Sequence, residues 1–379
     1  MSERFDAIVV GGGYIGCAVA YRLSRSGVKT LLLEKKEVGS GSSGANFGNV
    51  QVQDANFGLS MVLTRRGAEL MRTMEEELEE NIGYRTIGDL VVAEKPAHVD
   101  AIRQRYEKLI EVGLDVQWLD GPGLEEYEPN MRKGSACGAI RYMQGSVYPF
   151  WYIYGMIKAG KRFGLTVREH TEVGELYLRG GRCCGVTLKD GTVIEAENVI
   201  VTAGPGTHAV CATAGLDAPV KTVKAEAIVT EAIRPFIRHT YASAAFFAEA
   251  HDEGGAASSL CMAQTMHGNI LIGETTQGYS LVDEKHWENT SPMHCAAIPE
   301  RVKRYFPELA KVKVIRSYTA SSPFTDSCLP VFGKTSVSGL LVAAGFKSTV
   351  VMTPMAGRIM ADLVTKDRCD YNLREFITI

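Results

Sequence analysis

Hydrophobic and polar positions alternate in a recognisable order over the first 34 residues. An apolar run at 7–10 is followed by three glycines, then by apolar residues at helical spacing, and a second apolar run at 30–33 ends on Glu34. A short apolar run bounded by turn residues is typical of a buried strand, whereas i, i+3 spacing is typical of an amphipathic helix. The segment therefore predicts a strand, a glycine turn, a helix and a second strand.

The same patterns recur along the rest of the chain. They predict a long helix over 59–80, a strand over 85–93, a charged helix over 99–112 and a helix that ends at Phe163. Turns at 179–182 and 189–191 separate three short strands, the last of which runs into a second glycine turn at 203–206. The chain closes with a strand over 339–344 and a helix that starts near Pro354, with Gly357 in its first turn.

The pattern of strands, glycine turns and helices seen in the first residues is interrupted twice and returns each time. This predicts two domains built from alternating segments of the chain. A chain of 379 residues is long enough for two hydrophobic cores. We assign 1–84, 141–215 and 315–379 to a cofactor-binding α/β domain. We assign 85–140 and 216–314 to a second, β-rich substrate or cap domain that is inserted in segments.

The glycine turn has the spacing of a dinucleotide-binding motif, with Gly11, Gly13 and Gly16 between a strand and a helix. Gly11 permits the tight turn, Gly13 allows a pyrophosphate to approach the backbone, and Gly16 allows close packing of helix on strand. Glu34 ends the second strand, where a carboxylate accepts hydrogen bonds from ribose hydroxyls and repels a 2′-phosphate. The motif therefore predicts FAD or NAD and disfavours NADP.

Composition narrows the possible partners and the compartment. The net charge of −3 gives no reason to expect nucleic acid or an acidic membrane surface, and no apolar run is long enough to span a membrane. No leader sequence precedes the first strand, and nine scattered cysteines show no metal-binding spacing. We therefore expect a cytoplasmic protein with reduced thiols and no metal. Strand alternation places Cys183 and Cys184 on opposite faces, against a redox pair.

Several further patches, in a fixed order, carry a family resemblance. They are GSGSSGANFG at 39–48, GSVYP at 145–149, VIVTAGPG at 199–206 and a C-terminal pattern of Asp326, Pro330, Gly333, 339–346, Pro354, Gly357, Arg358, Ala361 and Leu363. Together with the first motif they resemble the FAD-dependent amine oxidoreductases of the D-amino acid oxidase, glycine oxidase and sarcosine oxidase group. The flavin subunits of proline and opine dehydrogenases belong to the same resemblance.

The resemblance implies a Rossmann-like FAD-binding domain of the glutathione-reductase type. A cysteine that tethers the flavin in sarcosine oxidases is replaced by Arg316, which implies noncovalent FAD. The N-terminus of the closing helix is expected at the pyrimidine edge of the flavin, where its dipole favours negative charge. The expected FAD-binding residues are Gly11, Gly13, Tyr14, Ile15, Gly16, Glu34, Lys35, Ser42, Ser43, Asn46, Gly48, Val173, Ala203, Gly204, Gly345, Phe346, Lys347, Ser348 and Thr349.

The implied reaction is oxidation of the C–N bond of a small amino acid or secondary amine, with hydride transfer to flavin and hydrolysis of the imine. Ser322 stands where glycine and D-amino acid oxidases place a carboxylate-binding arginine. We name Arg316 and Lys347 as replacement cations, with a surface or structural salt bridge as the alternative role for each. Tyr318 could line the pocket, with core packing as its alternative role. The segment 269–273 lacks a lysine that would assist oxygen, which favours a dehydrogenase.

Two other functions share this sequence pattern. One is oxidation of a hydroxy acid or polyol phosphate on the same fold, because a fold does not fix its chemistry. The other is a flavin-bearing subunit of a heteromeric dehydrogenase with little activity alone. The expected partners are a small-molecule substrate and either further copies of the chain or a different subunit.

Overall fold

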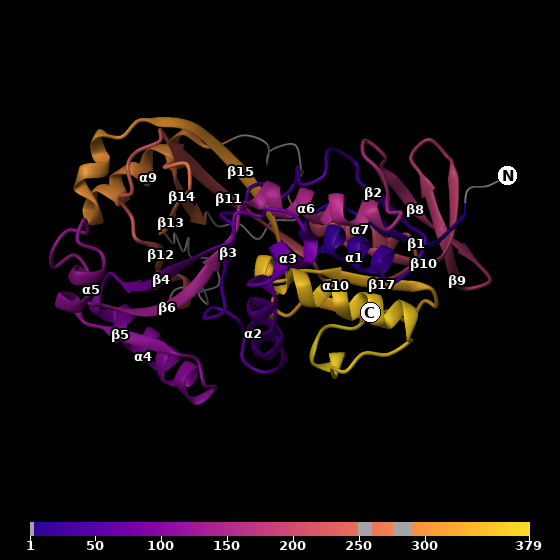
Figure 1. Ribbon diagram of the computed structural model, residues 1–379, viewed down its shortest axis with the longest axis horizontal. Coiled ribbons are helices and arrows are strands. Elements are labelled where there is room, and N and C mark those ends of the chain that lie inside the picture. Colours follow the sequence, from indigo (N-terminus) through magenta and orange to yellow (C-terminus); the bar gives the residue numbers. More distant parts are fainter. Residues whose placement is uncertain (1–3, 249–259, 276–289) are drawn as a thin grey trace. The chain divides into compact units, whose positions relative to one another are not determined.

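The computed structural model describes residues 4–248, 260–275 and 290–379, and two compact units share these residues (Figure 1). The first unit contains Met1–Tyr84, Val147–Thr222 and Ser322–Ile379, and the second contains Arg85–Ser146 and Val223–Ser321. The assignment of these units to cofactor and substrate binding remains a prediction. Part of the predicted segment 216–314 lies outside the described residues.

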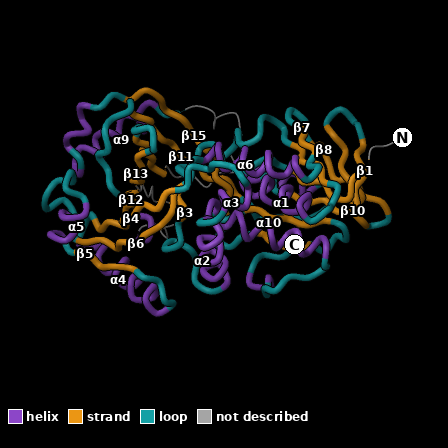
Figure 2. The backbone as a smooth tube through the Cα atoms, viewed as in Figure 1, coloured by secondary structure: helices purple, strands orange, loops and turns teal. Residues whose placement is uncertain are grey.

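The first unit combines helices with strands (Figure 2), and most of these strands are parallel. In chain order its elements are β1 (Arg4–Val10), α1 (Tyr14–Arg25), β2 (Thr30–Leu33), β3 (Asn49–Val50), α2 (Leu59–Met71), α3 (Met74–Leu78), α6 (Pro149–Arg162), β7 (Thr166–Arg168), β8 (Val173–Arg179), β9 (Arg182–Leu188), β10 (Val193–Val201), η1 (Gly204–Gly206), α7 (Thr207–Ala212), β16 (Val331–Lys334), β17 (Leu340–Ala344), α10 (Thr349–Thr365) and η4 (Leu373–Glu375).

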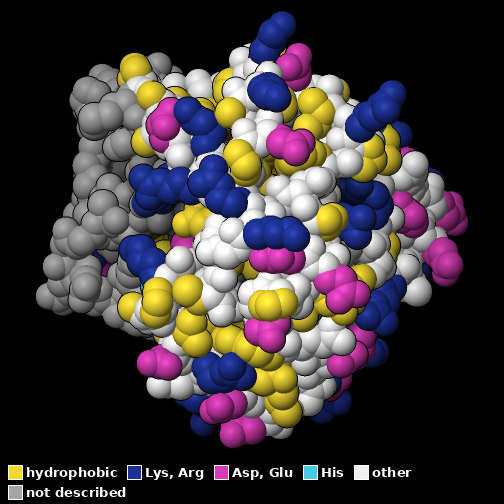
Figure 3. Space-filling view, turned by 90° about the vertical axis from the view of Figure 1, so that its left-hand side faces the viewer, with side chains coloured by type: hydrophobic (Ala, Val, Ile, Leu, Met, Phe, Trp, Pro, Cys, Tyr) yellow, Lys and Arg dark blue, Asp and Glu magenta, His cyan; other side chains and the backbone are white. Residues whose placement is uncertain are grey.

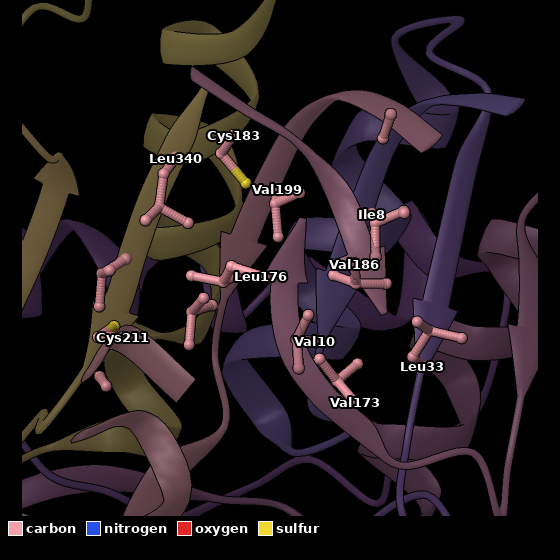
Figure 4. Close-up of a cluster of buried hydrophobic side chains, with 14 of the residues drawn as sticks. Ile8, Val10, Leu33, Val173, Leu176, Cys183, Val186, Val199, Cys211 and Leu340 are labelled. Atoms are coloured by element: carbon pink, nitrogen blue, oxygen red, sulfur yellow. The ribbon is translucent and has the colours of Figure 1, made fainter. Parts of the chain in front are cut away.

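The sheet of the first unit has the order β16-β17-β10-β1-β2-β7, as expected for a Rossmann-like domain. Strands β17, β10, β1, β2 and β7 are parallel, whereas β8 and β9 form an antiparallel extension of β10. Side chains of β1, β2, β8, β9, β10 and β17 enclose an apolar core that includes Ile8, Leu33, Leu176 and Val199 (Figure 4). Cys183 is buried in this core and Cys184 is partly exposed, which confirms the predicted alternation.

Helices α1, α2, α6 and α10 pack against one another beside this sheet. Glycines set the spacing at two of their contacts. A Cβ atom at Gly357 of α10 would lie 2.8 Å from the carbonyl oxygen of Ala18, and one at Gly67 of α2 would lie 2.0 Å from that of Val351. Real Cβ atoms do not approach this closely, so α10 can sit against α1 and α2 only because these positions lack side chains.

Two helix predictions are wrong in their bounds. The long helix expected over 59–80 is two helices, α2 and α3, because Thr73 donates its hydroxyl to the carbonyl oxygen of Leu70 and leaves the helical conformation. The closing helix begins at Thr349, before Pro354, which lies inside it. The β-branched residues 349–351 conceal this start, since such residues have low helix propensity.

The second unit is a mixed sheet covered by short helices. Its elements are β4 (Arg85–Ala93), α4 (Pro96–Glu111), β5 (Val116–Leu119), α5 (Gly121–Tyr127), β6 (Gly138–Ser146), β12 (His239–Ser243), α8 (Ala245–Ala248), β13 (Leu260–Gln264), β14 (Ile270–Thr275), α9 (Pro292–Tyr305) and η3 (Pro307–Lys311), while β11 (Lys221–Thr230) and β15 (Val314–Phe324) cross the unit boundaries.

Within the second unit the strands of this sheet follow the order β15-β11-β14-β13-β12-β4-β6, with β5 beside β6. Strand β12 runs parallel to β4, whereas the pairs β4/β6, β12/β13, β13/β14 and β11/β14 are antiparallel. Apolar residues such as Leu90, Tyr241, Met262 and Ile272 form a core with Phe306 after α9. The β-rich character predicted for this part of the chain is confirmed for its described residues.

Candidate cofactor site

The glycine turn after β1 is tightly enclosed by backbone. Gly11 has φ of 109°, and a Cβ atom there would lie 2.6 Å from the carbonyl oxygen of Thr202. A Cβ atom at Gly16 would lie 1.8 Å from the carbonyl oxygen of Gly11. Both positions therefore require glycine on steric grounds, which places the N-terminus of α1 directly against the end of the sheet.

The N-terminal cap residue of α1 is a glycine, so the helix begins without a side-chain cap. Its first cap residue, Gly13, makes no side-chain cap, and the backbone N–H of Tyr14 donates to Ser43 Oγ at 3.0 Å. A Cβ atom at Gly13 would lie 2.8 Å from the same Ser43 oxygen, so a side chain would fill this cradle. The side chains of Tyr14 and Ile15 are buried, so these residues face the turn with their backbone.

Glu34 stands at the end of β2, beside the glycine turn. Its Oε2 accepts from the backbone N–H of Gly12 at 2.7 Å, and its Oε1 accepts from that of Lys36 at 2.9 Å. A carboxylate accepts about four hydrogen bonds, so lone pairs remain for ribose hydroxyls. Lys35 is exposed, whereas the Val173 side chain belongs to the apolar core.

Two further loops of the first unit carry predicted cofactor residues. Asn46 Oδ1 accepts from the backbone N–H of Gly48 at 2.6 Å and so fixes the turn that ends the small-residue segment. Ser42 in the same segment is partly exposed. At the end of β10, Ala203 precedes Gly204, which has φ of 55° and open space where a side chain would stand.

The loop after β17 is shorter than the sequence suggests, because α10 starts at Thr349. Gly345 has φ of 77°, and the buried Phe346 ring packs against Phe332 with their centroids 5.1 Å apart. Thr349 donates its hydroxyl to the carbonyl oxygen of Phe346 at 2.8 Å. Lys347 and Ser348 are partly exposed at the start of the helix. The side chain of Phe346 is therefore part of the core, and only its backbone lies along the loop.

The three predicted catalytic residues fall into different units. Arg316 and Tyr318 lie on the part of β15 that belongs to the second unit, whereas Lys347 belongs to the first. Burial raises the pKa of Tyr318, and the nearby Arg316 charge opposes that effect. Arg316 is exposed. The union of these residues in one site remains a prediction.

Two residues near the turns, Thr202 and Asp54, were not predicted from the sequence as part of the site. Thr202 donates its hydroxyl toward the carbonyl oxygens of Val10 and Gly11, at 2.9 and 3.0 Å, and so ties β10 to the glycine turn. Asp54 accepts a hydrogen bond from the Ser348 hydroxyl at 3.0 Å, beside the start of α10. Thr202 stands directly after a predicted strand, which is a signal that sequence reasoning can use; Asp54 has no comparable signal.

These observations fit a dinucleotide and its pyrophosphate. The cradle at Gly13 accepts no side chain, the helix start has backbone N–H groups at its positive end, and a carboxylate stands at the end of the neighbouring strand. The fold and these features together define a dinucleotide-binding protein.

A family model narrows this class to one family. The model described as FAD dependent oxidoreductase matches residues 6–363, and the chain belongs to this family. Its cofactor is accordingly FAD, and it is an oxidoreductase.

Curated relatives extend over nearly the whole chain. Glycine oxidase of Geobacillus kaustophilus (strain HTA426) is 26% identical over 386 residues, which cover 99% of this chain and 97% of the relative. Sarcosine oxidase subunit beta of Rhodobacter capsulatus is 24% identical and covers 96% of this chain, with 86% of the relative matched. 4-Methylaminobutanoate oxidase (formaldehyde-forming) of Paenarthrobacter nicotinovorans is 25% identical, and the match covers 94% of this chain and 43% of the relative's length.

Solved structures share the fold. Glycine oxidase from Geobacillus kaustophilus superimposes with a TM-score of 0.87 at 24% identity, covering 99% of this chain and 98% of the other. L-proline dehydrogenase from P. horikoshii superimposes with a TM-score of 0.85 at 20% identity, covering 98% of this chain and 96% of the other. Within the described residues, no helix combines the length and the apolar character that crossing a membrane requires.

Proposed function

We propose that this protein oxidises the C–N bond of a small amino acid or secondary amine. The observation that supports this most directly is the set of curated relatives, whose names specify oxidation of glycine, sarcosine and 4-methylaminobutanoate. These three compounds share a nitrogen next to an oxidisable carbon, and each carries a carboxylate. The proposed substrate is therefore an amine of this type.

We assign the adenine half of FAD to the first unit. The turn at Gly11, Gly13 and Gly16 takes the pyrophosphate, and Glu34 takes the ribose hydroxyls. Ser43, Asn46 and Gly48 shape the small-residue segment against the cofactor, and Ala203 and Gly204 allow its close approach. The backbone of 345–349 and the start of α10 stabilise negative charge on the reduced ring. No cysteine stands at the tethering position of the sarcosine oxidases, so FAD is held noncovalently.

When bound, FAD supplies the acceptor for the hydride that leaves the carbon next to nitrogen. The chain itself contributes orientation and electrostatics. Arg316 or Lys347 would bind the substrate carboxylate in place of the missing arginine at Ser322. Tyr318, whose raised pKa keeps its hydroxyl protonated at neutral pH, would line the pocket and donate a hydrogen bond.

The experiment is an anaerobic absorbance titration of the FAD-loaded protein with glycine, sarcosine, proline, D-amino acids and opines. Loss of the oxidised flavin band with one of these amines, with release of ammonia or a smaller amine in proportion, is the expected result. Flavin that none of them bleaches, but that a hydroxy acid does bleach, would contradict the proposal. Peroxide formation in air would then separate an oxidase from a dehydrogenase.

A second candidate is a flavin-bearing subunit of a heteromeric enzyme. Relatives named as the beta subunit of sarcosine oxidase and as subunit HcnC of hydrogen cyanide synthase match 96% to 100% of this chain. Under this proposal the isolated chain retains FAD but reacts slowly with substrate. Purification of the chain from its native cells would then yield the flavin in a complex of several polypeptides, whereas a homo-oligomer with full activity would contradict it.

A further inference from the structure

The second unit contains a cavity that the proposed oxidation does not use. It has a volume of about 530 Å³, and its lining comes from β4, the loop after α5, the loop before β12, the start of β12 and the end of β13. A cavity of this size accommodates a small organic ligand. All of its lining residues belong to one unit.

Two arginines bring positive charge to the cavity. Arg85 donates to the carbonyl oxygen of Gln264 at 3.3 Å, and burial lowers the pKa of Arg85. The register of β12 with β4 pairs His239 with Gly88, which brings the preceding Arg238 beside Ile87. Within residues 4–248, 260–275 and 290–379, neither guanidinium forms an ion pair, and no carboxylate lines the cavity.

His239 forms part of the cavity wall. Its Nδ1 lies 2.7 Å from Oε1 of the buried Glu128, and its Nε2 lies 3.3 Å from Nε of Arg141. Because an arginine Nε–H only donates, Nε2 of His239 is the acceptor in the contact with Arg141. The carboxylate of Glu128, which is not part of the cavity lining, also accepts hydrogen bonds from the backbone N–H groups of Arg238 and His239.

Pro235 and Phe236 form an apolar part of the remaining wall, and hydrogen bonds hold their loop in place. Gln264 Oε1 accepts from the backbone N–H groups of Phe236 and Ile237, at 2.7 and 3.1 Å. Asn130 donates to the carbonyl oxygen of Phe236 at 2.7 Å. The loop that presents Pro235 and Phe236 is thus fixed from both sides, which reduces the ordering cost of binding a ligand against it.

We propose that this cavity binds a small organic anion, with its carboxylate or phosphate on Arg85 and Arg238 and its apolar or aromatic body against the Pro235–Phe236 wall. Guanidinium groups bind such oxyanions through paired, charge-assisted hydrogen bonds. General surface charge does not account for such binding, since Lys and Arg side chains mix with Asp and Glu on the face shown in Figure 3 and the chain has a net charge of −3. Selectivity must come from the two arginines in the cavity.

The test is calorimetric titration of the FAD-loaded protein with phenyl phosphate and with benzoate, while the flavin absorbance is recorded. We expect saturable binding of one molecule per chain that leaves the flavin spectrum unchanged, and no binding of the neutral benzyl alcohol. Inorganic phosphate alone should bind at least about tenfold more weakly than phenyl phosphate, because it lacks the body that contacts the apolar wall.

Substitutions then locate the site. Arg238→Glu reverses an exposed charge, so the variant should fold, and it should weaken anion binding at least about tenfold, as should Arg85→Gln. The matched control is Arg234→Glu, which makes the same charge reversal on the same loop outside the cavity lining and should change the affinity less than about threefold. Absence of saturable binding, an affinity unaffected by Arg238→Glu, or an equal loss in Arg234→Glu would each overturn the proposal. Since none of these readouts involves turnover, the result is independent of whether the amine oxidation is correct.

Discussion

Gly16 is the residue at which a single methyl group has the largest predicted effect on cofactor binding. A Cβ atom there would overlap the carbonyl oxygen of Gly11 and lie 2.6 Å from Thr202 Oγ1, so Gly16→Ala must push α1 away from β1. We expect a loss of unfolding free energy of about 1–3 kcal/mol and a protein purified with little flavin. Flavin absorbance per protein and thermal unfolding measure both effects. Gly121→Ala in the second unit is the control, because the nearest atom that a Cβ there would meet, the carbonyl oxygen of Ala136, lies at an ordinary 3.5 Å; equal loss in both variants would contradict the argument.

Glu34 offers a test of the ribose contact. Glu34→Ala removes the acceptor for the Gly12 N–H and the proposed acceptor for the ribose hydroxyls. Hydrogen bonds to a charged group contribute about 1.5–3 kcal/mol, so FAD should bind roughly 10–100-fold more weakly. Fluorescence titration of apoprotein with FAD measures this change. Glu37→Ala, an exposed carboxylate three residues away, should leave the dissociation constant unchanged.

Residue-level prediction of the backbone succeeded where one segment determines its course. The glycine turn, the position of Glu34 directly after β2 and the alternation at Cys183 follow from local spacing alone, whereas the cofactor contacts of the turn and of Glu34 stay predictions. The burial of the Phe346 side chain could not be predicted in this way, because it depends on contact with Phe332 from another strand. The cavity with Arg85 and Arg238 could not be predicted from the sequence for the same reason, since its lining comes from segments far apart in the chain.

At the scale of elements, Glu77 links three helices of the first unit. From the end of α3 it forms ion pairs with Arg22 and Arg25 of α1 and Arg358 of α10, at 2.5, 3.1 and 3.2 Å. Burial alone would raise the pKa of Glu77, but these charges, led by Arg22, outweigh it and lower the pKa. Glu77→Gln leaves three guanidinium groups together and should destabilise the fold by about 3 kcal/mol at pH 7.

The pH dependence of that effect has a definite sign. A carboxyl group whose pKa is lower in the folded state stabilises the fold above its unfolded pKa of about 4.3 and loses that contribution as pH falls through its folded value. The difference in unfolding free energy between the wild type and Glu77→Gln should therefore be largest near neutral pH and should shrink below about pH 4. Urea unfolding at pH 7, 5 and 3.5 measures it. Glu69→Gln, which breaks an exposed pair with Arg66, should cost less than about 1 kcal/mol at each pH; a cost for Glu77→Gln that does not shrink in acid would contradict the assignment.

Element boundaries show where local signals compete with packing. The strands around the turns at 179–182 and 189–191 were predicted because glycines mark both turns. The start of α10 was missed because residues 349–351 have low helix propensity, yet they are held in the helix by the close contact of Val351 with Gly67 of α2. Tertiary packing, which one sequence does not display, overrides propensity at that point.

At the scale of the whole molecule, FAD is expected to act as a structural ligand as well as a redox group. Any ligand that binds only the folded state raises its stability, by about 1.4 kcal/mol for each tenfold rise in free ligand above the dissociation constant. Protein stripped of FAD should therefore unfold at a lower temperature and recover as FAD is added. FMN lacks the adenylate that the glycine turn and Glu34 are proposed to hold, so it should restore little of this stability. In the Gly16→Ala variant, FAD and FMN should differ less in how much they raise the unfolding temperature. Equal stabilisation of the wild type by FMN and FAD would show that the turn does not bind the adenylate half.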